Sequence, residues 1–201
     1  MSKFKLLVIG LGVLVALTYG ILAIVLVSVS GDRPADKPGF TAKEAFTSAE
    51  KAARAWQADA QLVSANASWR GLPADELVEE QVTWSFTFFS PQTRSVSILS
   101  VTAQGAGPAE TLDASPATMV ADFAAWEVDS HQVLTAFLDH GGRGFLDENP
   151  DATVSLRLGP SEDGESLTWL AFGISSSNRS TVTVQVDPLS GEVRSSGSST
   201  S

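Results

Sequence analysis

The sequence predicts an α+β protein in which an N-terminal transmembrane helix precedes two repeats of a helix packed on a three-stranded or four-stranded antiparallel sheet. An uncharged apolar stretch opens the chain, polar and apolar residues alternate in several later segments, and a helical pattern followed by strand patterns occurs twice. The expected organisation is an anchor at 1–30, a linker at 31–39, a first repeat at 40–128, a second repeat at 129–194 and a disordered tail at 195–201.

The anchor prediction rests on Leu6–Val29, which is 24 consecutive residues without a charge. At about 1.5 Å per residue, a helix of this length crosses a hydrocarbon core of about 30 Å. Lys3 and Lys5 precede it, so the amino terminus is expected in the cytoplasm and the remainder outside. A cleaved secretory signal is the alternative, although signal cores are typically about 7 to 15 residues long. Small residues recur on one face of the expected helix and predict packing against a partner helix: Gly12, Ala16 and Gly20.

The first repeat is expected to begin with an amphipathic helix. Thr41 and Glu44 have the spacing of a capping box, and alanines and aromatics follow at helical intervals. Alternating residues then predict strands of an antiparallel sheet with one buried face, at 61–68, 81–89 and 95–103.

The second repeat is expected to follow the same order. A short strand is predicted at 123–128, and Asp129 with Gln132 then starts a second capped helix. Strands are predicted at 153–158, 167–174 and 181–186. Trp84 and Trp169 each centre an alternating strand after a helix, so we expect equivalent buried positions for both indoles.

Two motifs carry a resemblance to a known family. They are Ala55-Trp56-x-x-Asp59-Ala60 after the first helix and Val184-x-Val186-Asp187-Pro188-x-Ser190-Gly191 near the end. Together with the capped helices, they resemble the PepSY family of bacterial extracytoplasmic domains over residues 40–194. The resemblance implies a helix packed on an antiparallel sheet and a role in restraining peptidases or in scaffolding a membrane assembly. It implies no catalytic residues.

Composition disfavours several partners. The net charge is −10, and the part beyond the expected anchor carries 11 basic and 23 acidic residues. Such a surface repels phosphate backbones and anionic headgroups, so we expect no nucleic acid partner and no peripheral lipid binding. The chain has no cysteine, which excludes disulfides and thiol chemistry.

No residue pattern predicts an active site. His131 and His140 are the only histidines, and their spacing does not give the converging ligands of a zinc site. A Ser-His-Asp triad is compatible with the composition, but the chain lacks G-x-S-x-G. We therefore expect no catalytic residue, no metal ligand and no cofactor.

A calcium-loop pattern begins but is not completed. Asp147, Asn149 and Asp151 have the spacing of the first ligands. Ala152 stands where a glycine is needed and Leu158 where a bidentate glutamate should close the loop. A solvated turn between helix and strand is the favoured interpretation.

Trp69 and Arg70 are the candidates for protein contact, because periodicity does not place this tryptophan in the core. Partial packing of the indole under the loop that follows is the alternative. The favoured hypothesis is a non-enzymatic binding or regulatory protein, held at the cell membrane by a single-pass anchor, which presents an extracytoplasmic domain to a protein partner. The alternatives are an extracytoplasmic sensor of a small ligand or calcium, and an unrecognised hydrolase.

Overall fold

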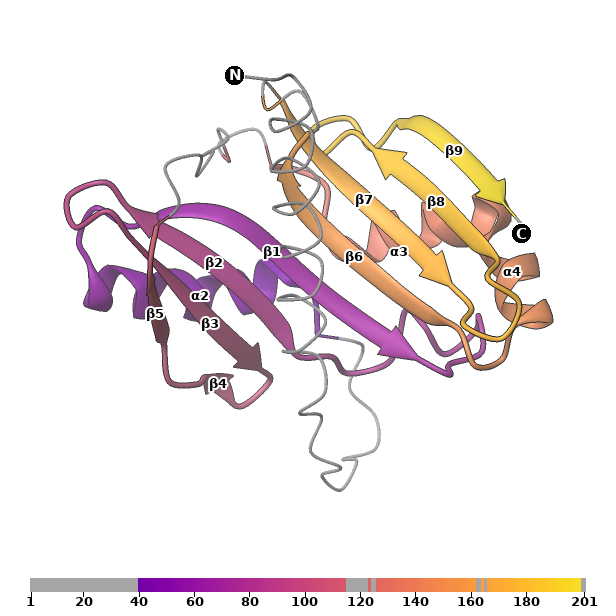
Figure 1. The fold of residues 1–201 in the computed structure, drawn as a ribbon, viewed down its shortest axis with the longest axis horizontal. Coiled ribbons are helices and arrows are strands. Elements are labelled where there is room, and N and C mark those ends of the chain that lie inside the picture. The colour runs from indigo at the N-terminus through magenta and orange to yellow at the C-terminus, as the bar shows by residue number, and fades with distance from the viewer. Residues whose placement is uncertain (1–39, 115–122, 124–125, 162–163, 165, 200–201) are drawn as a thin grey trace, which may run out of the picture. The chain divides into compact units, whose positions relative to one another are not determined.

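One antiparallel sheet of nine strands organises the part of the chain that the structure describes (Figure 1). The computed structural model describes residues 40–114, 123, 126–161, 164 and 166–199. The strands are β1 (Gln61–Arg70), β2 (Trp84–Ser90), β3 (Ser95–Thr102), β4 (Gly105–Ala106), β5 (Glu110–Asp113), β6 (Thr153–Pro160), β7 (Leu167–Ile174), β8 (Thr181–Val186) and β9 (Val193–Ser199). Their order is β4-β3-β2-β1-β6-β7-β8-β9, with β5 also paired to β3.

The β1–β6 pair joins the two halves of the chain. It runs antiparallel from Ala65 opposite Leu158 to Arg70 opposite Thr153. Pairing these two strands gives both of them hydrogen-bonding partners on each side and leaves no open edge between the halves. The result is one continuous core.

Helix α2 (Ala42–Trp56) covers the first half of the sheet. The Thr41 hydroxyl accepts the amide of Glu44, and the Glu44 carboxylate accepts the amide of Thr41, which is the capping box expected from the sequence. The buried side of the helix is a stripe of small residues that lets its backbone approach the strands: Ala42, Ala45, Ala49 and Ala53.

The second helical region is broken into three segments. Helix α3 (Ser130–Phe137) passes through a π-helical turn at Leu138–Gly142 into the short helix α4 (Arg143–Glu148). Gly141 has φ of 105°, a conformation that L side chains rarely adopt, so this glycine permits the change of direction. Phe145 of α4 then packs on β7, where a Cβ at Gly173 would lie 2.7 Å from its ring.

The two helix starts meet and share their caps. The Asp129 carboxylate accepts the amides of Ser130 at 2.7 Å and of Lys43 at 3.1 Å, and the Ser130 hydroxyl accepts the amide of Ala42 at 3.0 Å. One aspartate therefore caps α3 and supports the first turn of α2, because helix amino termini favour a negative charge.

Trp84 and Trp169 occupy equivalent places in the core, as predicted. Both are fully buried. Each indole N–H donates to the carbonyl just before a helix cap, Trp84 to Phe40 at 2.8 Å and Trp169 to Val128 at 2.9 Å. Their rings meet edge to face at 6.4 Å.

The predicted fold class is wrong. The sequence left open whether the two repeats share a sheet, and the β1–β6 pairing merges all nine strands into one sheet where three or four strands were expected under each helix. The second helix is not one element, because the chain turns at Gly141. The predicted anchor at Leu6–Val29 lies outside the described residues, and no helix among those described is long and apolar enough to cross a membrane.

Two local predictions are also wrong. Residues 195–201 were expected to be a disordered tail, yet Val193–Ser199 forms β9 through backbone pairing with β8. A strand was expected at 123–128, but the described part of this segment has no strand. There the amides of Glu127 and Val128 donate to the carbonyl of Pro188, which ties the segment to the β8–β9 turn.

Candidate functional site

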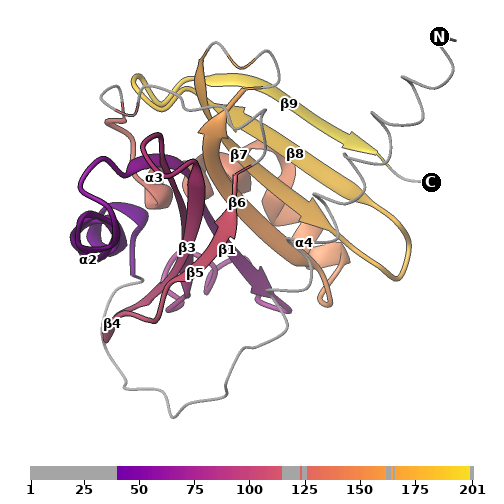
Figure 2. The ribbon, with the colours of Figure 1, turned by 60° about the vertical axis from the view of Figure 1, so that its left-hand side comes forward.

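One face of the sheet carries no described helix. In Figure 1 the helices α2, α3 and α4 lie behind the sheet, and Figure 2 shows α2 on one side of the strands of the first half. Strand alternation turns a second set of side chains away from these helices. We call this surface the helix-free face, and it consists of Ser64, Asn66, Ser68, Ser85, Thr87, Phe89, Val96, Ile98, Ser100, Ser155, Arg157, Gly159, Thr168, Leu170, Phe172, Ile174, Thr181, Thr183 and Gln185.

The middle of the helix-free face is polar and contains one cation. Arg157 of β6 lies between Asn66 of β1 and Leu170 of β7. A Cβ added at Gly159 would lie 3.3 Å from Arg157 Nε and 3.5 Å from Ser64 Cβ. The guanidinium therefore lies low over the sheet, in the space that the missing side chain of Gly159 leaves.

Arg157 has no hydrogen-bond or ion-pair partner within the described parts of the chain. Three other arginines do, since Arg54 pairs with Glu50, Arg143 with Asp75 and Arg194 with Asp187. Arg157 is exposed on β6, but its guanidinium lies against its neighbours, and this partial desolvation lowers its pKa from the ordinary value. The side chain stays charged at neutral pH, because an arginine pKa starts above about 12.

Apolar side chains flank this polar centre on both sides. Leu170 and Phe172 lie on the β7 side, and Ile98 and Phe89 lie on the β2 and β3 side, all of them half-buried. At the margin of the face, Ile174 is 42% exposed. The face thus carries an arginine and aromatic side chains, which are enriched in protein interfaces.

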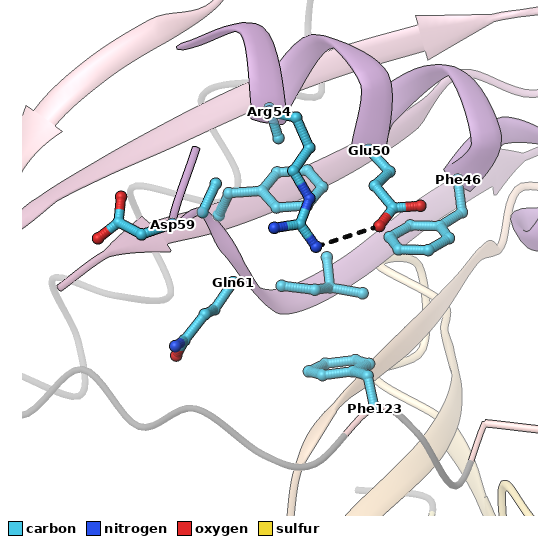
Figure 3. A pocket seen from close by; sticks show the side chains of 10 residues that line it. Phe46, Glu50, Arg54, Asp59, Gln61 and Phe123 are labelled. Atoms are coloured by element: carbon cyan, nitrogen blue, oxygen red, sulfur yellow. Dashed lines mark hydrogen bonds and ion pairs between the residues drawn. The ribbon is translucent and has the colours of Figure 1, made fainter. Parts of the chain in front are cut away.

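A pocket of about 520 Å³ lies between α2 and the start of β1 (Figure 3). Phe46, Phe88 and Phe123 supply much of its apolar wall, while Glu50 and Arg54 lie across its rim. The Arg54 guanidinium already binds Glu50 at 3.4 Å and the Ala58 carbonyl at 3.0 Å. The pocket has room for a small molecule, and the described residues that line it include no cysteine, histidine or serine to act as a nucleophile.

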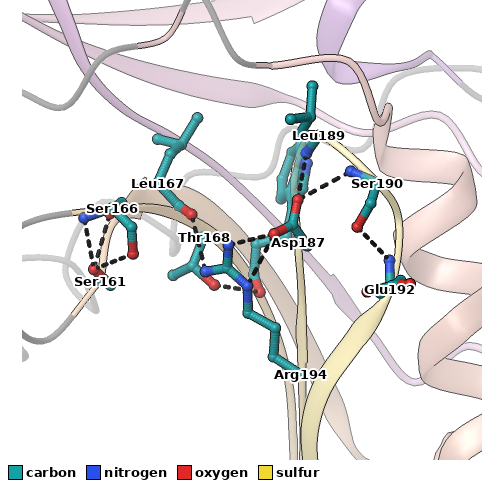
Figure 4. Close-up of polar contacts among 10 residues, drawn as sticks. Ser161, Ser166, Leu167, Thr168, Asp187, Leu189, Ser190, Glu192 and Arg194 are labelled. Carbon is teal, nitrogen blue, oxygen red and sulfur yellow. Dashed lines mark hydrogen bonds and ion pairs between the residues drawn. The ribbon is translucent and has the colours of Figure 1, made fainter.

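Asp59 and Asp187, the two aspartates of the motifs that resemble the PepSY family, each hold a turn through hydrogen bonds. Asp187 accepts the amides of Leu189 and Ser190 and pairs with Arg194 (Figure 4). The Ser190 amide and the Arg194 guanidinium lower the pKa of Asp187 to about 2. The amide of Gln92 likewise lowers the pKa of Asp59. Both carboxylates already accept hydrogen bonds within a turn and have lowered pKa values, so neither is suited to act as a general base.

The position expected for Trp69, outside the core, is wrong. Its side chain is only 6% exposed and packs edge to face on Trp84 at 6.3 Å, so the indole is part of the core and does not offer a protein contact. Arg70, the next residue, is exposed at the end of β1. The residues proposed for helix packing, Gly12, Ala16 and Gly20, lie outside the described residues.

The two histidines lie apart from any acid cluster. His131 is half-buried on α3, and the exposed His140 places Nδ1 2.8 Å from the Ala136 carbonyl. Across the described residues, no three side chains of histidine, aspartate or glutamate converge as a metal site would require.

The calcium-like sequence forms a structural corner. Asn149 is buried, its amide nitrogen donates to the Phe145 carbonyl, and its oxygen accepts from Asn178 at 2.7 Å and Ser180 at 3.2 Å. The side-chain oxygen that a calcium ion would need is already used. These bonds tie the end of α4 to the β7–β8 turn.

No protein-family model matches the chain, and neither does any curated protein. The resemblance to the PepSY family therefore has no support from these comparisons. Among solved structures, the chain is similar to a predicted lipoprotein from Clostridium difficile 630, with a TM-score of 0.51 and 11% sequence identity. The match covers 77% of this chain and 92% of that chain. At this identity the likeness shows the fold alone.

Sequence analysis did not single out Arg157. The signal was present, because Val154, Leu156 and Leu158 alternate inward and place this arginine on the outward side of the strand. Whether Arg157 has an acidic neighbour depends on which strands flank β6, and the local sequence does not show which strands these are.

Proposed function

We propose that the chain is a non-enzymatic binding or regulatory protein that docks a protein partner on the helix-free face, outside the cytoplasm and at the membrane. The observation that carries this proposal is a broad sheet surface with half-buried apolar strips around an arginine that pairs with none of the described residues. An arginine among apolar side chains is typical of residues that dominate binding energy.

The size of the face supports a protein partner. Eight strands in the main path give seven spacings of about 4.8 Å, or about 34 Å, and an eight-residue strand is about 26 Å long. A standard interface buries about 800 Å² on each partner. One face of this sheet is large enough to supply that area.

The proposed location has two supports. The uncharged stretch Leu6–Val29 follows two lysines, a pattern typical of segments that direct a chain to or across a membrane. The similar structure from Clostridium difficile is a predicted lipoprotein, although this chain has no cysteine on which a lipid anchor could be attached.

The test is capture of partners by the full chain from gently solubilised membranes. Ile98→Lys combined with Phe172→Lys should abolish co-purification of a stoichiometric partner, because both changes place a charge on the helix-free face. Leu189→Lys is the matched control, since Leu189 is 59% exposed in the β8–β9 turn, and it should leave capture unchanged. Equal capture by all three proteins would refute docking on this face.

A small-ligand sensor is the second candidate function, favoured by the 520 Å³ pocket beneath α2. Gln61 lines this pocket at the exposed start of β1, and Gln61→Trp would fill part of it. If the pocket is a ligand site, native mass spectrometry of the purified full chain should detect a bound small molecule that the variant lacks. A chain that carries no such molecule in either form would count against this function.

A further inference from the structure

We propose that Arg157, with Ser64 and Asn66 beside it, binds a carboxylate of the partner protein, either a side chain or a chain end, next to an apolar group. This inference rests on the proposed function, because it names the chemistry that the helix-free face recognises.

The geometry points to a site with free donors. The Ser64 side chain is nearly buried, and its hydroxyl accepts the Asn66 amide at 3.2 Å without donating to any described residue. The guanidinium of Arg157 lies beside it over Gly159. Guanidinium N–H groups form a planar fork that matches the two oxygens of a carboxylate.

Among the described residues, no acidic side chain on this face serves as a counterion for the Arg157 guanidinium. On the side of β1, the neighbours on the face are Ser64, Asn66 and Ser68, and on the side of β7 they are Thr168, Leu170 and Phe172. None is acidic, although acids exceed bases by 23 to 13 in the chain. An unpaired cation in a partly dehydrated setting gains from a charge-assisted hydrogen bond to an anion.

The same surroundings select the type of anion. The net charge of −10 repels a polyanion such as a nucleic acid or an anionic membrane much more strongly than it repels a single carboxylate. Leu170 lies directly opposite Arg157 on β7, with Phe172 two residues further on. These side chains offer apolar contact to hydrocarbon attached to the carboxylate, which free phosphate lacks.

The test is side-chain NMR of the full chain in mild detergent, with arginine Nε labelled by ¹⁵N. N-acetyl-leucine serves as the probe, and it should shift the Arg157 Nε–Hε signal saturably. N-acetyl-leucinamide, which lacks the charge, should not. Arg157→Lys should weaken binding of the probe about tenfold, because an ammonium cannot form the bidentate pair, while Arg70→Lys is the matched control without effect.

A second variant tests the position of the guanidinium. Gly159→Ala would bring a Cβ 3.3 Å from Arg157 Nε and displace this flexible side chain, so binding should weaken severalfold with the melting temperature retained. The inference is overturned if the amide binds as well as the acid, if inorganic phosphate binds more tightly, or if all arginine signals drift without saturation.

Failure of this inference and failure of the proposed function give different results. If Arg157 does not bind the carboxylate but the combined Ile98→Lys and Phe172→Lys variant still loses the partner, docking on this face is supported and the carboxylate site is refuted. If the carboxylate binds saturably but that variant retains the partner, the proposed docking function is refuted instead.

Discussion

Replacing Trp169 by alanine should remove a large part of the stability of the domain. The indole is completely buried and meets Trp84 at 6.4 Å and Trp126 at 6.1 Å in edge-to-face contacts. Truncating a buried tryptophan costs about 3 to 5 kcal/mol. Each lost aromatic pair adds about 0.5 to 1.5 kcal/mol beyond the buried area, so we expect a loss near the upper end, about 5 kcal/mol.

One hydrogen bond limits this cost. The Val128 carbonyl accepts from Trp169 and also from the Trp126 indole, each at 2.9 Å, so this acceptor keeps a partner in the variant. Urea unfolding followed by circular dichroism measures the change. Trp126→Ala is the control and should cost less, since Trp126 is 8% exposed. A loss below about 1.5 kcal/mol for Trp169→Ala would refute the central role of this indole, because removing a single buried methyl group costs up to about that much.

Four further predictions follow from the packing and the charges. Gly173→Ala should destabilise by about 1 to 3 kcal/mol in urea unfolding, because the new Cβ would lie 2.7 Å from Phe145 and 2.8 Å from Val182, whereas Gly197→Ala meets no atom within 4 Å and should be neutral. The pKa of Asp187 is lowered to about 2, so its stabilising effect is present above its ordinary pKa of 3.8 and is lost as pH falls toward 2; the melting temperatures of the protein and of Asp187→Asn should converge over that range, and a constant difference would contradict the assignment. His131→Ala and His140→Ala should leave partner capture unchanged, and loss of function in a variant that folds and binds would favour an enzyme. Lys37–Ser201 expressed alone should unfold cooperatively, since this segment is one compact unit, and recovery only as aggregate would show that it needs other parts.

Local patterns predicted several elements well. The capping box at Thr41 and Glu44 starts α2, and the strands predicted at 167–174 and 181–186 are β7 and β8. These elements have strong periodicity and clear boundary residues. The equivalent burial of Trp84 and Trp169 was predicted for the same reason, because each lies at an inward position of an alternating strand.

A bulge explains why Trp69 was misplaced. The register between β1 and β2 shifts between Leu62 and Ser64, which inserts one residue and reverses the alternation beyond it. Ala65, Ala67 and Trp69 therefore point into the core, although simple alternation from Leu62 turns them outward. The sequence has no proline or glycine there to mark the bulge.

Long-range pairing explains the other differences. The β1–β6 ladder joins segments almost ninety residues apart, so no local pattern reveals that the two halves share a sheet. Strand β9 is rich in serine and exposed, and its pairing with β8 uses backbone groups that any residue provides. The helix-free face likewise emerges only when the neighbours of β6 are known.

Site-specific photo-crosslinking in cells tests docking on the helix-free face most directly. A benzophenone amino acid replaces Phe172 on this face or Lys51 on the exposed side of α2 in the full chain. We predict a discrete crosslinked species, formed with a single partner protein, from position 172 and none from position 51. Crosslinks from position 51 alone, or equal crosslinks from both positions, would contradict the account.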